Sequence, residues 1–264
     1  MDGPRIATLA AASILLVGAE AARGSRRFGG DDGGFVPPNR TVATCEERVA
    51  RLLARDAACL DRCTFSAARA TFFKGAPFDD EPCEQACSAA FVRSATALFA
   101  KNTCPPCITR FPPALVAAIN ERSTDAATAL VACAGTIPLG DDDGGFVAPD
   151  RATGKCELAV GKAVSKLDQA IIACHLRAAD AALKGRNFDE EACEDAAERR
   201  YDAAVGRLNA CPPCLDPAAL ATQVRANADA GNALIYCASP SGAFVDPPGD
   251  EPAGYATARA ASPT

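Results

Sequence analysis

This 264-residue chain contains two Cys-Pro-Pro-Cys motifs, Cys104–Cys107 and Cys211–Cys214, whose spacing could support redox chemistry. C-x-x-C spacing supports thiol–disulfide exchange when one cysteine is a low-pKa thiolate at a helix N-terminus, usually within a βαβ unit. Here each motif follows an expected helix, and no strand pattern lies beside it. Redox exchange through these motifs is therefore kept only as a lesser alternative.

His175 is the only histidine of the chain. No histidine follows either C-x-x-C motif, which argues against covalent haem attachment, and catalytic pairs or triads have one imidazole at most. We interpret His175 as a residue on a helix face rather than as a ligand or a base. Four-cysteine zinc sites stay possible, although an exported chain with an even number of cysteines favours disulfides.

Two aspartate-rich strings, Asp31–Asp32 and Asp141–Asp143, invite a calcium interpretation. An EF-hand loop that begins at Asp141 needs an oxygen ligand at its fifth position and a glutamate at its twelfth, where the chain has Gly145 and Ala152. We interpret both strings as solvated linkers. The sequence therefore predicts no catalytic residue, no cofactor and no metal, in a protein that is not an enzyme.

Two C-x-x-x-C motifs, Cys59–Cys63 and Cys83–Cys87, indicate which elements hold the cysteines. Cysteines four residues apart lie on one face of a helix. Two antiparallel helices facing each other would pair the outer cysteines, Cys59 with Cys87, and the inner ones, Cys63 with Cys83. The sequence predicts a helical hairpin that is cross-linked twice.

The chain also contains a strong internal repeat. The string DDGGFV at residues 31–36 recurs at residues 142–147, an offset of 111 that also matches Cys45 with Cys156. Both copies then contain the Cys-Pro-Pro-Cys corner and a final cysteine, Cys133 or Cys237. The predicted fold is all-α, a tandem duplication of a disulfide-stapled antiparallel helical hairpin followed by a shorter helical segment.

Apolar residues at steps of three and four predict first helices over about residues 45–73 and 156–183. Thr44 is expected to cap the first of these helices. Gly75 is expected to end it, and Asp79 to cap the following helix. Asp56 is a misfit on the predicted seam. The last segment of each copy is expected to break near its middle.

Seven disulfides are predicted, each within one copy and each contributing about 3 kcal/mol. The second copy lacks both cysteines that match Cys59 and Cys87, and this joint absence favours a bond between them. The last segment must turn back for the final pair of each copy to form. The predicted pairs are Cys59–Cys87, Cys63–Cys83, Cys174–Cys193, Cys156–Cys211, Cys45–Cys104, Cys107–Cys133 and Cys214–Cys237.

The N-terminus has a short basic start, an apolar run over residues 6–19 and the pattern Ala19-Glu20-Ala21. These features predict a signal peptide over residues 1–21, with cleavage after Ala21. Export to a secreted or periplasmic location would place the chain where disulfides persist. The expected mature organisation is a flexible arm (22–40), Cys-rich helical repeat 1 (41–137), an Asp/Gly/Pro linker (138–150), Cys-rich helical repeat 2 (151–240) and a disordered tail (241–264).

Signal-peptide cleavage would change the net charge from −6 to −5, because it removes one basic and two acidic residues. A mildly acidic chain without a basic stripe is a poor candidate for binding nucleic acid or anionic membranes. No segment of the mature chain is long and apolar enough for a membrane span. We expect a monomer with an unknown extracellular or envelope partner.

The paired C-x-x-x-C hairpin over residues 59–87 resembles plant α-hairpinins, which are small defence peptides and protease inhibitors, although its inter-motif connection is longer. Over about residues 31–237 the chain resembles exported, alanine-rich, cysteine-rich bacterial repeat proteins. DDGGFV, Ala173-Cys174-His175, residues 188–194 and the Cys-Pro-Pro-Cys corner carry this resemblance. It implies no activity. The sequence predicts a secreted, non-catalytic binding or envelope/matrix module, with a hairpin protease inhibitor or toxin-like protein as the alternative.

Overall fold

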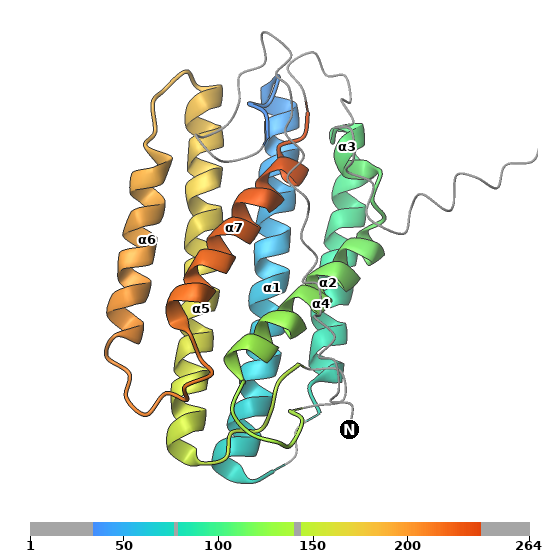
Figure 1. The fold of residues 1–264 in the computed structure, drawn as a ribbon. Helices are drawn as coiled ribbons and strands as arrows, with labels where there is room; N and C mark the ends of the chain where they lie inside the picture. The colour runs from blue at the N-terminus through green and yellow to red at the C-terminus, as the bar shows by residue number, and fades with distance from the viewer. Residues whose placement is uncertain (1–33, 77–78, 140–143, 239–264) are drawn as a thin grey trace, which may run out of the picture. The chain divides into compact units, whose positions relative to one another are not determined.

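The computed structural model describes residues 34–76, 79–139 and 144–238. Within these residues the chain forms helices and no named strand (Figure 1), so the predicted all-α class is confirmed. The predicted signal peptide, most of the arm and the tail lie outside the described residues. The helices are α1 (Arg40–Lys74), α2 (Glu81–Phe99), α3 (Pro106–Thr109), α4 (Pro113–Val131), α5 (Arg151–Leu183), α6 (Glu190–Val205) and α7 (Pro217–Ile235).

The long helices α1 and α5 lie side by side and antiparallel (Figure 1). A Cβ atom built at Gly154 of α5 would come within 2.9 Å of the Phe72 ring of α1, and one at Gly161 would come equally close to the Phe65 ring. Real Cβ atoms do not approach this closely, so the two glycines make room for the rings. This contact joins the first half of the chain (α1–α4) to the second half (α5–α7).

Each long helix forms a hairpin with the helix that follows it, α2 on α1 and α6 on α5. Five disulfides staple these hairpins and their open ends. All five are pairs that the sequence predicts, four of them from the antiparallel register and Cys45–Cys104 as a pair slightly outside it. They are Cys45–Cys104, Cys59–Cys87, Cys63–Cys83, Cys156–Cys211 and Cys174–Cys193.

The other two disulfides join the two halves, and here the prediction is wrong. The structure pairs Cys107 with Cys237 and Cys133 with Cys214, in place of Cys107–Cys133 and Cys214–Cys237. The predicted pairs required a break in each last segment, but α4 and α7 each run unbroken for 19 residues. Such a helix rises about 28 Å. It therefore carries each final cysteine away from the corner of its own half.

The start of the described chain is part of this fold. The Phe35 N–H donates to the carbonyl oxygen of Tyr236 at 2.7 Å, beyond the end of α7. At the matching position of the repeat, the Phe146 N–H donates to the Ala132 carbonyl at 2.7 Å, beyond the end of α4. Residues 34–40 thus do not belong to a flexible arm.

Helix α1 begins earlier than the sequence predicts. The Asn39 side chain accepts hydrogen bonds from the N–H groups of Thr41 and Val42 at 2.9 and 3.0 Å, which makes Asn39 the N-cap. Thr44 lies inside the helix, so the cap predicted at Thr44 is wrong. Asn39 lies before the first residue of the apolar periodicity, so the periodicity alone places the start of the helix too late.

The other helix ends follow the predicted chemistry more closely. Gly75 ends α1 with a left-handed φ of 60°, a conformation that glycine adopts without strain. The N-cap position of α2 is Asp80, one residue after the predicted Asp79, and the Asp80 side chain forms no capping hydrogen bond to the helix. Asp189 and Asp216 cap α6 and α7 with side-chain hydrogen bonds to the first-turn N–H groups.

The apolar cores also cross between the halves. Val131 of α4 packs in a cluster with Val160 and Leu167 of α5 and Tyr201 of α6. Cys237, beyond α7, packs against the cluster of the first half. All described residues belong to one compact unit. Packing and disulfides thus join the two halves in one unit, whereas the sequence predicts every disulfide to lie within one copy.

Candidate functional site

Both Cys-Pro-Pro-Cys corners bond outward to other segments. A C-x-x-C oxidoreductase works by making and breaking a bond between its own two cysteines. None of the cysteines in the described part of the chain is free. This pairing argues against redox exchange at either corner. The four bonds are Cys104–Cys45, Cys107–Cys237, Cys211–Cys156 and Cys214–Cys133.

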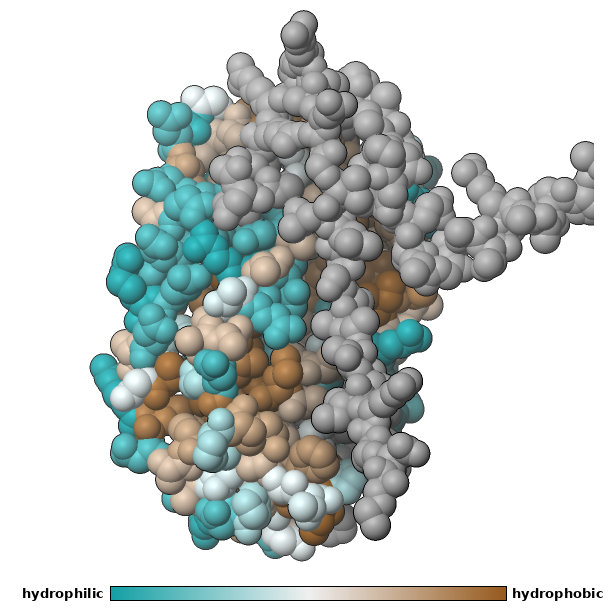
Figure 2. All heavy atoms as spheres, in the orientation of Figure 1, coloured by the Kyte–Doolittle hydropathy of each residue, from teal (hydrophilic) through white to brown (hydrophobic). Residues whose placement is uncertain are grey.

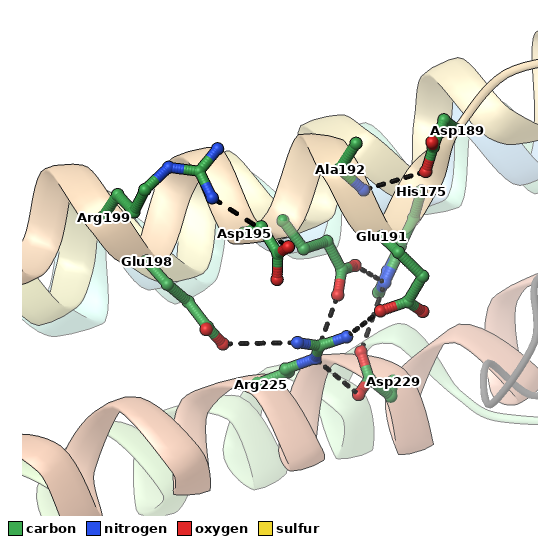
Figure 3. Close-up of polar contacts among 10 residues, drawn as sticks. His175, Asp189, Glu191, Ala192, Asp195, Glu198, Arg199, Arg225 and Asp229 are labelled. Atoms are coloured by element: carbon green, nitrogen blue, oxygen red, sulfur yellow. Dashed lines mark hydrogen bonds and ion pairs between the residues drawn. The ribbon is translucent and has the colours of Figure 1, made fainter.

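His175 lies on a buried face of α5, between α6 and α7 (Figure 3). Only 3% of its surface is exposed. Its Nε2 atom lies 2.9 Å from Glu194 Oε1 of α6 and 3.3 Å from Asp229 Oδ1 of α7. The sequence placed this histidine on a helix face. The structure adds that the face meets two carboxylates.

Neighbouring local features hold these side chains in place. The disulfide Cys174–Cys193 joins the residues that precede His175 on α5 and Glu194 on α6. The Asp189 side chain accepts a hydrogen bond from the Ala192 N–H at 2.9 Å and so sets the start of α6. The same disulfide that staples the hairpin therefore also brings the imidazole to the carboxylate.

Arg225 of α7 lies beside the imidazole and is shared among four carboxylates (Figure 3). Burial acts to lower the pKa of its guanidinium, but the hydrogen bond to Glu191 and the surrounding carboxylate charges raise that pKa above its usual range. Its partners are Glu191, Glu194 at 3.1 Å, Glu198 at 3.5 Å and Asp229 at 3.9 Å.

Two carboxylates each face both the imidazole and the guanidinium of this group. Glu194 turns Oε1 to the imidazole and Oε2 to the guanidinium, and Asp229 divides its two oxygens in the same way. Glu194 is 1% exposed. We call the group the His175 cluster, and its members are His175, Glu190, Glu191, Glu194, Glu198, Arg225 and Asp229.

Glu190 completes the buried part of the His175 cluster. It is the first residue of α6 and is 6% exposed. One ligand atom from each of His175, Glu190 and Glu194 lies within 4.8 Å of the others. Asn232, near the end of α7, and Tyr236, just beyond it, are also buried. Burial and the charge of Glu46 raise the pKa of the Tyr236 phenol.

The first half has different residues at the matching positions of the repeat. Thr64 stands where the second half has His175, and its hydroxyl donates to Glu84 Oε1 at 3.4 Å. Glu121 stands where the second half has Arg225. The buried glutamate of the second helix is thus present in both halves, whereas the imidazole and the guanidinium belong to the second half alone.

Two further buried glutamates tie the halves together. Glu46 accepts a hydrogen bond from the Ala238 N–H at 3.3 Å, and Glu157 accepts one from the Ala134 N–H at 2.9 Å. Burial raises the pKa of Glu46 to about 8 and also raises the pKa of Glu157, although these backbone hydrogen bonds partly offset the effect. Each glutamate thus holds the end of a helix from the other half.

The sequence singled out His175 but missed the carboxylates and the arginine around it. The sequence interpretation assigned the acidic residues near position 190 to a helix start, and Glu190 and Glu191 do lie in the first turn of α6. A usable signal was the four-residue spacing of Glu190 with Glu194 and of Arg225 with Asp229, which places each pair on one helix face. Which faces meet is decided by tertiary packing.

The His175 cluster can hold a positive charge between imidazole and carboxylates, either as a proton or as a metal cation. None of the helices in the described residues has the length and apolarity that a bilayer crossing requires. Comparison with protein-family models, with curated protein sequences and with solved structures finds no match to this chain.

Proposed function

We propose that the chain is an exported, non-catalytic helical module that binds a partner outside the cell or in the cell envelope. The observation that carries this proposal is the pairing of all fourteen cysteines in seven disulfides. Such bonds persist in oxidising compartments and are rare where glutathione keeps thiols reduced. The apolar N-terminal run with its Ala19-Glu20-Ala21 pattern supports the same location.

An exposed apolar surface supports a binding role. Three large apolar side chains between residues 130 and 146 are exposed: Ile137 at 64%, Leu130 at 43% and Phe146 at 39%. Backbone hydrogen bonds hold this segment, among them one from the Val147 N–H to the Ile137 carbonyl at 2.7 Å. Hydrophobic residues gather on the lower part of the face in Figure 2, about the lower ends of α4 and α7. Exposed apolar side chains on a held backbone are typical of binding surfaces.

The test compares capture of extracellular and envelope proteins by three oxidised, purified baits. The wild-type mature chain should retain a specific partner, and the variant Ile137→Ser/Phe146→Ser should lose it because the apolar contact is removed. Ile119→Ser, which changes an exposed residue in the middle of α4, is the matched control and should retain the partner. Equal capture by all three baits would contradict this binding surface.

Two further measurements address location and the alternative function. Intact-mass analysis of exported material should give a chain that begins at Ala22. A panel of serine and cysteine proteases should keep full activity at micromolar concentrations of the protein. Inhibition would favour the hairpin-inhibitor alternative. The loop between α5 and α6 would then be the first segment to mutate, because its Arg186 is exposed.

A further inference from the structure

We propose that the His175 cluster binds one divalent transition-metal cation, with His175, Glu190 and Glu194 as ligands. Helix α5 supplies the imidazole, and α6 supplies the two glutamates. Imidazole with carboxylate oxygens is a donor set that suits Zn²⁺ and its first-row neighbours. The sequence predicted no metal site, because it could not place these helices together.

The geometry around Nε2 carries the proposal. Ligands bound at zinc distances in a tetrahedron lie about 3.3 Å apart. The Nε2 atom of His175 lies 2.9 Å from a Glu194 oxygen and 3.3 Å from an Asp229 oxygen. Two carboxylate oxygens facing one nitrogen favour a proton or a metal cation between them. A metal cation would engage Nε2 together with oxygens of Glu190 and Glu194, since the three ligand atoms lie within 4.8 Å of one another.

Arg225 orients the ligands without supplying one. It contacts Glu194 Oε2 at 3.1 Å and Asp229 Oδ2 at 3.9 Å, which leaves the other oxygen of each carboxylate turned to the imidazole. Hydrogen-bonding partners behind metal-bound carboxylates fix their orientation in this way. Arg225 contacts four carboxylates of the cluster and thus fixes the positions of several of them at once.

The position of the cluster within the repeat is a second, independent observation. The first hairpin has the additional disulfide Cys59–Cys87, whereas the second has alanines at positions 170 and 197. The hairpin with one covalent link fewer is the one that contains the His175 cluster. A cation bound by α5 and α6 would replace the missing link, because binding to the folded state alone stabilises that state.

The test uses the full mature chain, oxidised and shown by thiol assay to contain no free cysteine. After treatment with a chelator, the chain is titrated with Zn²⁺ and, separately, with Mn²⁺. One equivalent of metal should bind, and the midpoint of thermal unfolding should rise with the concentration of free metal. Failure of both cations to bind stoichiometrically would overturn the proposal.

His175 is the only histidine, so an imidazole ¹⁵N spectrum reports on this residue alone. With Zn²⁺ bound, the Nε2 resonance should shift to that of a metal ligand, and Nε2 should carry no proton. An Nε2 that carries a proton in the presence of Zn²⁺ would overturn the proposal and identify a buried ion pair instead.

Three variants separate ligation from folding. His175→Thr introduces the first-half residue and should weaken Zn²⁺ binding at least about 100-fold, and Glu190→Gln at least about 10-fold. Circular dichroism and disulfide maps should remain those of the wild type. Asp195→Asn is the matched control, since this exposed carboxylate of α6 pairs with Arg199, and it should bind as wild type. Wild-type affinity in His175→Thr would show binding to surface carboxylates and overturn the site.

Discussion

At the scale of single residues, the least expected feature is the number of acidic side chains inside a helical core. Charged residues are rarely buried unless they are paired. Asp56, the misfit of the predicted seam, accepts a hydrogen bond from the Asn120 amide of α4 at 2.9 Å. Glu46 and Glu157 accept backbone hydrogen bonds beyond the ends of α7 and α4. These acids therefore join helices rather than interrupt a seam.

Burial of Glu46 predicts a stability that falls as pH rises. Its folded-state pKa of about 8 lies above the ordinary value of 4.5, so the folded protein binds this proton more tightly than the unfolded chain. The contribution is fully present below about pH 4.5 and is lost as pH rises through about 8. Asp168 acts in the same direction, because burial and the charge of Asp61 raise its pKa to about 6.

Glu46→Gln should flatten this dependence, since glutamine keeps the acceptor for Ala238 and cannot ionise. Thermal unfolding midpoints between about pH 5 and pH 8.5 should fall less in Glu46→Gln than in the wild type, with a remaining slope near pH 6 from Asp168. Glu47→Gln is the control, because Glu47 forms only a partly exposed pair with Arg51. Equal slopes in all three proteins would contradict the buried ionisation of Glu46.

At the scale of elements, the two hairpins share one plan but differ in their links. Both have a disulfide that reaches the first turn of the second helix, Cys63–Cys83 or Cys174–Cys193. Only the first has the neighbouring Cys59–Cys87 bridge. The second hairpin has the His175 cluster on the same pair of helices. The helices are therefore held by different means in the two halves.

Removal of the additional bridge measures its contribution. Cys59→Ala/Cys87→Ala gives the first hairpin the alanines of the second and should lower the free energy of unfolding by about 3 to 4 kcal/mol. The reciprocal variant, Ala170→Cys/Ala197→Cys, should form a new bridge and raise it, because the repeat places both positions opposite each other. Denaturant unfolding of oxidised proteins gives both values. No loss in the first variant would show that strain in the native bond cancels its effect.

At the scale of the whole molecule, the two halves are closed onto each other. Cys107–Cys237 and Cys133–Cys214 cross between them, with sequence separations of 130 and 81. The hydrogen bonds of Phe35 and Glu46 to the end of α7 link the halves again. The final cysteine of each half therefore stabilises the other half.

A single cut distinguishes this closed arrangement from two independent domains. A specific protease site inserted at residues 140–143, between the halves, should give a nicked protein that stays one band on a denaturing gel without reductant. Reduction should separate it into two fragments. A variant with alanine at the four crossing cysteines should separate without reduction. Separation of the nicked wild-type protein without reductant would restore the pairs Cys107–Cys133 and Cys214–Cys237.

The sequence by itself determined the helical class, the hairpins and the five disulfides along them. These features depend on local rules, because a four-residue spacing places cysteines on one helix face and an antiparallel turn sets which of them meet. Gly75 was likewise identifiable as the residue that ends the first long helix from its chemistry alone.

Only the tertiary structure decided how the halves meet and what surrounds His175. Whether α4 and α7 break or run straight depends on packing against α1 and α5, and that choice moves a final cysteine by about 28 Å. The His175 cluster likewise draws residues from three helices that are separated by up to 54 positions. Such contacts follow from which helix faces pack together, and local periodicity carries no information about that.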